Sequence, residues 1–328
     1  MLRGRLEQHF NRIWYQQARP PLLYRLLSRI HARLPQARFR RPTARPPVPV
    51  IVVGNLTVGG GGKTPLVIAL ARHLLAGGHR VAVISRGYGG TANASPKRVQ
   101  RGDRPARVGD EPLLVADQTD APVWIGRQRA QVLEAAVSAG ANVIISDDGL
   151  QHTALARSFE ICLIDGGRGL GNGELLPAGP LRQPASRLDQ VDLVLVKGEG
   201  QGPAGAVRVD LVPECLTVLG NEERLTLDDW RGRRVNAVCG IANPDGFFRT
   251  LKALDMTVEP HAFPDHHRFK KTDMEGLDGS VVVTAKDAVK LRGLGLEQTV
   301  YVLHVALDLP EAVITAVDRH LSEWNASA

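Results

Sequence analysis

The sequence predicts an α/β protein with a doubly wound, mostly parallel sheet, a second, smaller α/β domain and an N-terminal basic amphipathic helical arm. Three observations lead to this prediction. An apolar, β-branched run at residues 50–53 is followed, five residues later, by four consecutive glycines at 59–62 and then by a helical stretch. Similar apolar runs alternate with helical segments along the chain, as in parallel sheets. The arginines of the first fifty residues stand apart from a nearly neutral remainder.

The first domain is expected to hold a set of strands that are buried on both faces, because their apolar runs are continuous rather than alternating. Helices are expected at residues 66–75, stopped by Gly77 and Gly78, and at residues 127–139, stopped by Gly140. The expected strands are residues 50–53, 80–84, 123–125, 143–145, 160–164 and 191–196.

A length of 328 residues favours about two domains, and the glycine-rich residues 198–202 resemble a linker. We expect the arm over residues 1–45, the first domain over 46–205 and the smaller domain over 206–328. Residues 207–211 and 301–305 are expected to pair as a ribbon at the hinge. In the smaller domain we expect strands at 235–239, 281–283 and 300–305, and helices at 244–254, 286–291 and up to about 324.

The glycine run after the first strand predicts a phosphate-binding loop (P-loop). Backbone N–H groups and the positive end of the following helix form an anion site, to which Lys63 adds a charge and Thr64 a hydroxyl ligand for Mg²⁺. The strict pattern G-x-x-x-x-G-K-[ST] would have glycine at Thr57, so a glycine-rich connector is the alternative. The expected nucleotide contacts are Thr57, Val58, Gly59, Gly60, Gly61, Gly62, Lys63 and Thr64.

Acidic residues follow other expected elements. Asp147 and Asp148 end an apolar strand, a position that holds Mg²⁺ in phosphate-handling proteins. Asp110 heads a helix-like stretch, where it is either an N-cap or part of a ligand site at the carboxyl edge of the sheet. His266 and His267 lie beside an acid and an arginine, a pattern that favours His–Asp pairing over zinc because no further ligands lie at suitable spacing.

Two loops complete the candidate site. Arg86 follows the second expected strand in a glycine-rich segment and is a candidate phosphate ligand. Residues 171–182 contain too much Gly and Pro for a helix or strand, and long loops in compact domains are often functional. The alternative is that this loop is solvent-exposed and has no function.

The net charge of +7 is located in the arm. Residues 1–50 hold eleven arginines, no lysine and one acid, which gives +10, whereas the remaining 30 basic and 33 acidic groups give −3. Apolar stripes occur on the same segment. The first consists of Leu2, Leu6, Phe10, Ile13 and Trp14, and the second lies within residues 22–34. This combination suits an anionic membrane surface. Packing on the core, an organelle transit peptide and nucleic-acid binding are the alternatives.

Composition excludes some classes. No apolar stretch reaches the length of a membrane span, and aromatic residues at 5% disfavour base stacking. The cysteines Cys162, Cys215 and Cys239 are scattered and are expected to be reduced thiols in a cytosolic protein.

Together these segments resemble one family, the tetraacyldisaccharide 4'-kinases of Gram-negative bacteria. Departures are small: Gly61 replaces a usual Thr, Ala285 a frequent Glu, and Gly246 a common Arg. The segments that carry the resemblance are Gly54–Pro65, Ser85–Gly89, Gly109–Pro112, Asp147–His152, Gly171–Arg182, Gly240–Pro244, Pro264–His267 and Thr284–Lys290.

The resemblance implies a kinase that uses ATP and Mg²⁺ to phosphorylate the 4'-hydroxyl of an acylated glucosamine disaccharide 1-phosphate, giving lipid IVA. It implies that Asp110 takes the hydroxyl proton while paired with His266, with His267 as the other candidate partner. Thr64, Asp147 and Asp148 would organise the metal, and Arg86, Asn172, Arg182 and His267 are candidates for substrate contact.

A monomer at the cytoplasmic face of the inner membrane, without nucleic acid, is further expected. A partitioning-type switch ATPase is the alternative function. Such proteins usually carry a lysine at the position of Val58 and lack a second lobe with an Asp-His-His segment. A nucleic-acid-binding ATPase that uses the arginine arm is a third possibility.

Overall fold

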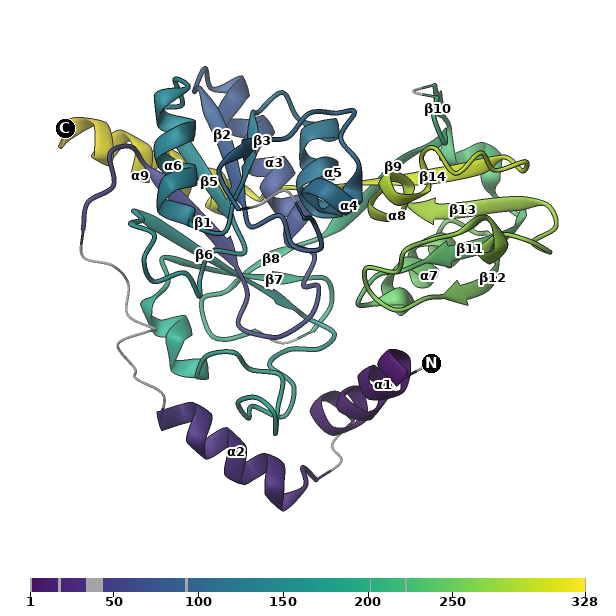
Figure 1. The fold of residues 1–328 in the computed structure, drawn as a ribbon, viewed down its shortest axis with the longest axis horizontal. Coiled ribbons are helices and arrows are strands. Elements are labelled where there is room, and N and C mark those ends of the chain that lie inside the picture. The colour runs from purple at the N-terminus through teal and green to yellow at the C-terminus, as the bar shows by residue number, and fades with distance from the viewer. Residues whose placement is uncertain are drawn as a thin grey trace.

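The computed structural model of the protein describes residues 2–16, 19–33, 44–91, 94–200, 202–221 and 223–327. Two lobes, each built on its own sheet, lie side by side, and the two helices of the arm lie below the first lobe in the view of Figure 1. The predicted fold class is confirmed, with strands and helices alternating through most of both lobes.

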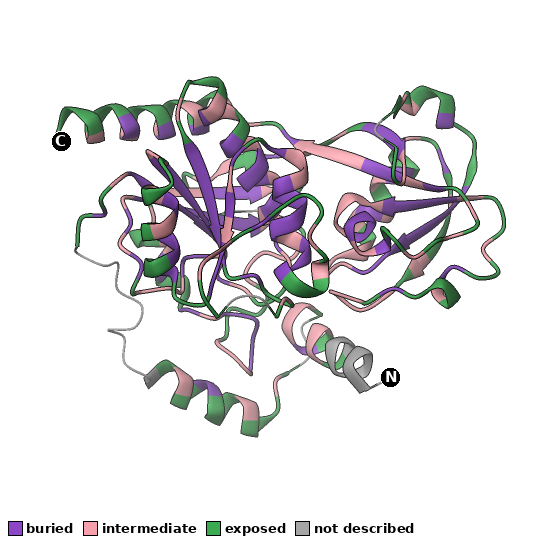
Figure 2. Ribbon diagram, turned by 45° about the horizontal axis from the view of Figure 1, so that its top comes forward, coloured by how far each residue is buried: buried purple, intermediate pink, exposed green. Residues whose placement is uncertain are grey.

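The sheet of the first lobe has eight strands in the order β3-β4-β2-β5-β1-β6-β7-β8. Its neighbours are parallel except for β3 and β4. The central strands are fully buried, as their continuous apolar runs predict, and they form the dark core of this lobe in Figure 2. The strands are β1 (Val50–Gly54), β2 (Val81–Ser85), β3 (Lys97–Arg98), β4 (Val123–Ile125), β5 (Val143–Asp147), β6 (Phe159–Asp165), β7 (Leu193–Lys197) and β8 (Val207–Val209).

Helices cover both faces of this sheet. Ile51 and Val53 share a core with α3 (Lys63–Ala76) and α5 (Asp110–Gln118), whereas Val50 and Val52 share one with α6 (Arg129–Ser138). The alternation of these side chains between faces is the strand period of two. The shorter elements are α4 (Pro105–Val108) and the 3₁₀ helix η2 (Ala185–Gln190).

The second lobe has a six-stranded sheet in the order β10-β9-β14-β13-β11-β12. The strands from β14 to β12 are parallel, whereas β9 is antiparallel to both β10 and β14. Its elements are β9 (Leu211–Val218), β10 (Arg224–Leu225), η3 (Leu227–Trp230), β11 (Arg234–Cys239), α7 (Pro244–Ala253), β12 (Thr257–Ala262), η4 (Lys271–Asp273), β13 (Ser280–Thr284), α8 (Ala285–Leu291) and β14 (Val300–Leu307).

The last helix, α9 (Glu311–Ala326), returns to the first lobe. Val313, Val317 and Leu321 are buried in the same core as α3 and β1. Strand β8 also belongs to the first sheet, next to β7. The chain therefore leaves the first lobe along β9 and comes back along β14. Because β8 and α9 both belong to the first lobe, the expected boundary at residue 206 does not separate the two lobes.

The hinge ribbon pairs other residues than expected. Residues 207–209 pair in parallel with β7, and β14 pairs instead with the following strand β9. β9 and β12 were missed as strands because Pro213 and Pro260 interrupt their patterns. β12 is an edge strand, and the register of β9 shifts near Pro213, so both prolines occupy positions that a sheet tolerates.

The arm consists of α1 (Leu2–Tyr15) and α2 (Leu22–Arg33), both resting on the loop of residues 171–182. Trp14 Nε1 donates to the carbonyl of Pro177 at 3.1 Å, and Ile13 is buried. Ser28 Oγ donates to the carbonyl of Leu175 at 3.0 Å. The first apolar stripe thus packs on the protein. The side chains of Leu2 and Leu6, and all of Leu34, lie outside the described residues.

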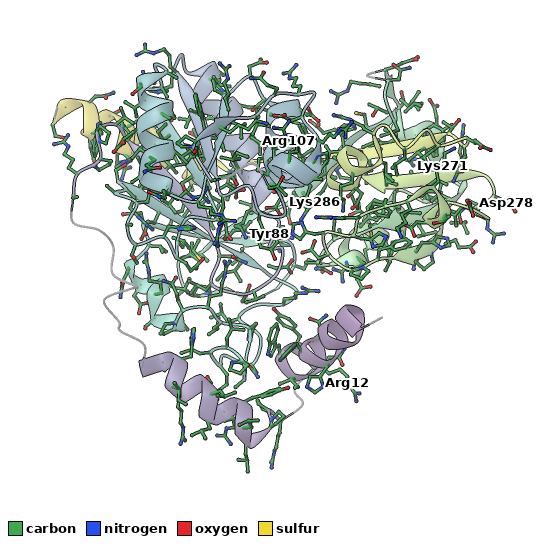
Figure 3. The ribbon with its side chains drawn as sticks, in the orientation of Figure 1. Arg12, Tyr88, Arg107, Lys271, Asp278 and Lys286 are labelled. Atoms are coloured by element: carbon green, nitrogen blue, oxygen red, sulfur yellow. The ribbon has the colours of Figure 1, made fainter. Side chains whose placement is uncertain are left out.

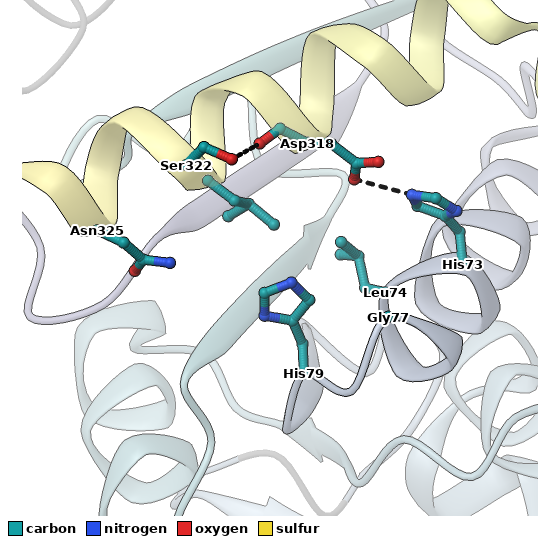
Figure 4. A pocket seen from close by; sticks show the side chains of 8 residues that line it. His73, Leu74, Gly77, His79, Asp318, Ser322 and Asn325 are labelled. Atoms are coloured by element: carbon teal, nitrogen blue, oxygen red, sulfur yellow. Dashed lines mark hydrogen bonds and ion pairs between the residues drawn. The ribbon is translucent and has the colours of Figure 1, made fainter.

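A cavity of about 220 Å³ lies between the end of α3 and α9 (Figure 4). His73 Nε2 and Asp318 Oδ1 lie 2.9 Å apart at its rim. Lys63 and His73 are ten residues apart on α3, which corresponds to about 15 Å along the helix. This cavity is therefore remote from the P-loop.

Replacing Leu321 with Ala should destabilise the first lobe, because Leu321 is 3% exposed in the core shared with α3. The expected loss is about 2–5 kcal/mol of unfolding free energy. Hydrogen–deuterium exchange should accelerate in β1 and α3 but not in β11 and β13. The exposed Glu323→Ala is the control on the same helix. Unchanged exchange in β1 and α3 would mean that α9 does not support the first lobe.

Candidate functional site

The P-loop joins the end of β1 to the start of α3 at the carboxyl edge of the first sheet. Gly62 precedes the helix with φ of 79°, in the left-handed region. A Cβ at this position would also lie 2.8 Å from Nζ of Lys197. The backbone conformation therefore favours glycine here, and a larger residue would also displace the end of the Lys197 side chain. The loop leads directly into the helix N-terminus, where backbone N–H groups are free to bind an anion.

Lys63 is held at the mouth of this loop by two acceptors. Its Nζ lies 3.2 Å from Asn55 Oδ1 and 3.3 Å from Asp148 Oδ1. Arg182 also contacts the Asp148 carboxylate. Its two Nη atoms each lie 3.1 Å from one of the two carboxylate oxygens. Burial opposes ionisation of Asp148, but Lys63 and Arg182 hold its pKa well below the usual range. Asp148 is therefore ionised at neutral pH.

Arg182 also fixes the shape of the loop. Its Nε donates to the carbonyl of Thr57 at 3.1 Å, and an Nη atom bonds Asn55 Oδ1. The side chain therefore links the P-loop, Asp148 and the loop of residues 171–182. Sequence reasoning assigned Arg182 to the substrate, whereas the structure places it against protein groups.

Asp147 has a different environment from its neighbour. It is 2% exposed, and its Oδ1 has no hydrogen-bond partner among the described residues. Burial, with the nearby Glu111 carboxylate, raises the pKa of Asp147 to about 7. A buried carboxylate oxygen without a partner is costly, and a cation would satisfy it. Together with the buried Thr64 at the start of α3, it supplies oxygen donors of the kind that Mg²⁺ prefers.

Asp110 and His266 meet across the boundary between the lobes. Asp110 opens α5 of the first lobe, and His266 lies in the loop after β12 of the second lobe. His266 Nδ1 lies 3.1 and 3.0 Å from the two carboxylate oxygens of Asp110. The exposed ring of Tyr88 lies 5.3 Å from the His266 ring. Figure 3 shows Tyr88 and Lys286 at this junction.

The contact alters both protonation equilibria. Burial raises the pKa of Asp110, but the hydrogen bond from His266 and the charge of Lys286 outweigh it and lower the pKa to about 2. Burial lowers the pKa of His266, but the hydrogen bond to Asp110 outweighs it and raises the pKa above its usual value. An ionised Asp110 and a readily protonated His266 therefore form one coupled pair.

The remaining candidates take other positions. His267 Nε2 lies 2.9 Å from Asp273 Oδ2 and stacks on Phe263, so it is not the partner of Asp110. The Asn172 amide donates to the carbonyls of Ile13 and Ala178 and holds the arm rather than facing a ligand. Arg86 is exposed. Burial lowers the pKa values of Arg129 and His152, and the charge of Arg86 adds to this effect.

Several residues of this site were not assigned roles from the sequence. Arg129 is buried and donates to the carbonyl of Asp147 at 2.9 Å. Lys197 and Asp165 pair at 3.0 Å where β6 and β7 end, beside the P-loop. Lys286 bridges Glu111 and Asp265. Lys286 lies in one of the segments that carry the family resemblance, which was the only signal for it in the sequence.

The three cysteines are buried and free. Burial raises the pKa values of Cys162 and Cys239 to about 12, so both are unreactive thiols at neutral pH.

A P-loop at the carboxyl edge of a parallel sheet, facing a second lobe that contributes a histidine, defines a P-loop phosphotransferase of two lobes. The family model of tetraacyldisaccharide-1-P 4'-kinase matches residues 21–322. The tetraacyldisaccharide 4'-kinase of Alcanivorax borkumensis is 43% identical over 98% of this chain and 99% of its own. That of Pseudomonas aeruginosa is 41% identical over 92% and 93%, respectively.

This chain is also similar to a solved structure. The "apo" form of LpxK from Aquifex aeolicus in complex with ATP is 28% identical, with a TM-score of 0.72, over 98% of this chain and all of that one. The chain belongs to the tetraacyldisaccharide-1-P 4'-kinase family. It is a kinase of lipid A biosynthesis that phosphorylates the 4'-hydroxyl of a tetraacyldisaccharide 1-phosphate.

The pairing of Asp110 with His266 predicts an observable titration. In the wild type, the imidazole of His266 should titrate above about 6.5. In Asp110→Asn it should titrate at lower pH than in the wild type, because burial and Lys286 are then opposed by Asp265 alone. Histidine-selective NMR, with the signal assigned by His266→Gln, measures both. His304, whose pKa is lowered by burial in the second lobe, should not change. Equal His266 values in wild type and Asp110→Asn would contradict the contact.

Proposed function

We propose that phosphoryl transfer takes place at the junction of the two lobes, with the P-loop holding ATP and Asp110 receiving the proton of the 4'-hydroxyl. One observation carries this proposal: the carboxylate of Asp110 and the imidazole of His266, from different lobes, are in hydrogen-bond contact. Glu111, next to Asp110, is close enough to Asp147 to raise its pKa. The proton acceptor is thus adjacent to the phosphate-binding edge.

The proposed ATP site uses the loop from Thr57 to Thr64. Its backbone N–H groups bind the phosphates, and Lys63 supplies the charge at the transferred group. The relative from Aquifex aeolicus that was solved in complex with ATP supports this assignment. Lys63 is already oriented by Asn55 and Asp148, so little side-chain entropy remains to be lost when the nucleotide binds.

Mg²⁺ is proposed to be held by Thr64, Asp147 and Asp148. The unpartnered Oδ1 of Asp147 and its raised pKa fit a site that is completed by a cation. When bound, the metal would supply positive charge to the phosphate oxygens. The described residues contain no group of three or more His, Cys, Asp or Glu side chains arranged for a metal. The hydroxyl of Thr64 and the nucleotide phosphates are therefore required as further ligands.

The role of Asp110 follows from its low pKa. A carboxylate with a pKa of about 2 is ionised at neutral pH but cannot deprotonate a free alcohol in advance. Phosphoryl transfer passes through a loose transition state, so the hydroxyl needs to lose its proton only as its bond to phosphorus forms. Asp110 accepts the proton at that stage, and His266 fixes its orientation.

The acceptor is a lipid, and we propose that α2 brings the enzyme to the membrane that contains it. Ser28 and His31 turn one side of α2 toward the protein, which leaves an apolar face and the exposed Arg25 and Arg29 in solvent. No helix of the described residues is long and apolar enough to cross a membrane. The exposed apolar residues of α2 are Leu22 (81%), Leu23 (61%), Leu26 (56%), Leu27 (42%) and Ile30 (54%).

Within this proposal the protein acts at the cytoplasmic face of the inner membrane, where ATP is available. It acts as a monomer, since the P-loop, the carboxylates and His266 all come from one chain. Arg86, on the exposed loop after β2, remains the candidate for contact with the substrate phosphate.

Labelled ATP and an acylated disaccharide 1-phosphate should give a bis-phosphorylated lipid with the wild type. Lys63→Ala should lower the rate by roughly 10²–10³-fold or more, because it removes a charge at the transferred group. Asp110→Asn should lower kcat strongly with little change in ATP affinity. Lys97→Ala, which breaks a comparable ion pair with Asp103 at 2.8 Å, is the control and should stay active.

Two outcomes would contradict these roles. Near-normal turnover by Lys63→Ala would mean that the loop does not bind the transferred phosphate. Weakened ATP binding by Asp110→Asn, with kcat unchanged, would make Asp110 a structural or metal-linked residue instead of a proton acceptor.

Replacing Leu22, Leu26 and Ile30 together with Ser should release the protein from vesicles of phosphatidylglycerol and phosphatidylethanolamine, while ATP binding persists. Salt should weaken wild-type binding without abolishing it, because screening affects only the charge contribution. Trp14 is not a suitable target, since its indole packs on Pro177. Val212→Ser, at a 47% exposed position of β9, is the matched control. Equal co-sedimentation of the triple variant and wild type would exclude α2 as the membrane contact.

A further inference from the structure

Lys286 occupies the boundary between the lobes, and the proposed chemistry assigns it no role. It lies in the first turn of α8, and its side chain is 15% exposed. Its Nζ lies 2.9 Å from Glu111 Oε1 of α5 and 3.4 Å from Asp265 Oδ1 in the loop after β12. One ammonium group thus joins the first lobe to the loop that carries His266.

The two carboxylates that Lys286 contacts are sequence neighbours of the paired residues. Glu111 directly follows Asp110, and Asp265 directly precedes His266. We propose that Lys286 is a positioning residue, which holds these two segments in register so that Asp110 and His266 meet in the geometry required for proton acceptance. This inference rests on the proposed function of Asp110.

Electrostatics supports this role. A buried ammonium is costly unless it is paired, and here burial is outweighed by Glu111, Asp265 and Asp110, which raise the pKa of Lys286. Removing the charge would leave these three carboxylates facing one another across the lobe boundary. Their repulsion opposes the approach of the lobes, so the Asp110–His266 contact should loosen.

The helix that carries Lys286 does not depend on it. Thr284 caps α8 by accepting a hydrogen bond from the backbone N–H of Asp287. The Asp287 carboxylate is neutralised by Lys290 at 2.6 Å and accepts from the N–H of Gly240 at 3.0 Å. A cation in the first turn is unfavourable for the helix dipole. Lys286 is therefore not needed to stabilise α8. Its contacts lie instead across the boundary between the lobes.

Lys286 also affects the protonation of the pair. The charged groups that face Asp110 and His266 are Lys286 and Lys290 from α8, Asp265 from the loop after β12, and Glu111 beside Asp110. Lys286 lowers the pKa values of both Asp110 and His266. Because Asp110 must be ionised to accept the proton, its titration sets the acid limb of the rate profile. Removing Lys286 raises the pKa of Asp110 and moves that limb to higher pH.

The experiment compares four variants of the full-length protein in the lipid kinase assay: Lys286→Met, Lys286→Arg, Asp265→Asn and Arg292→Met. Arg292 is the matched control, because it lies just after α8 and forms another ion pair between the lobes, with Asp117 of α5. For each variant, kcat, KM for ATP, the pH profile of kcat and Tm are measured.

Lys286→Met should lower kcat on the order of 10- to 100-fold, the loss expected from a small misplacement of reacting groups. Its KM for ATP and its Tm should stay close to those of Arg292→Met, and its acid limb should move up by about one pH unit. Lys286→Arg should restore most of kcat. Asp265→Asn keeps the ammonium and should lower kcat without raising the acid limb, which tests the proposal even if Lys286→Met folds poorly.

Equal kcat and equal acid limbs for Lys286→Met and Arg292→Met would overturn the inference. So would a kcat loss in Lys286→Arg as large as that in Lys286→Met. Asp110→Asn in the same assay separates the two proposals. If that variant is inactive while Lys286→Met behaves like the control, only the role of Lys286 fails. If Asp110→Asn stays active, the proton-acceptor role itself fails.

Discussion

β9 and β14 pair antiparallel from Leu211 opposite Leu307 to Val218 opposite Tyr301, and they carry the chain out of the first lobe and back into it. Because α9 then packs against α3 in the first core, both ends of the second lobe are anchored. The second lobe is therefore held next to the carboxyl edge of the first sheet. The loop with Asp265 and His266 reaches α5 only because of this double connection.

Three carboxylates near this edge differ in protonation because their neighbours differ. Lys63 and Arg182 keep Asp148 ionised, and His266 with Lys286 keeps Asp110 ionised. Asp147, buried without a partner for Oδ1, has a raised pKa instead. Asp148 and Asp110 are thus already paired with cationic side chains, whereas Asp147 still lacks a counter-charge. This difference fits the roles proposed for them: support of the P-loop, proton acceptance and metal binding.

The arm has two faces with different surroundings, which its sequence does not separate. α1 and the polar side of α2 pack on the loop of residues 171–182, through Trp14, Asn172 and Ser28. The opposite side of α2 keeps its leucines in solvent. Since Arg182, at the end of that loop, also braces Thr57 and Asp148, the proposed membrane contact and the P-loop are joined by one continuous set of hydrogen bonds.

The sequence by itself determined the features that depend on neighbours in the chain. The P-loop, the buried strands and Asp147 at the end of β5 were predicted because apolar runs, glycines and a helix start act locally. The contact between Asp110 and His266 joins residues 156 positions apart, and only the family resemblance indicated it. The tertiary structure alone decided that His267 pairs with Asp273, that α9 returns to the first core and that Lys286 lies between Glu111 and Asp265. Such contacts arise from the packing of whole lobes, which no pattern within a single segment encodes.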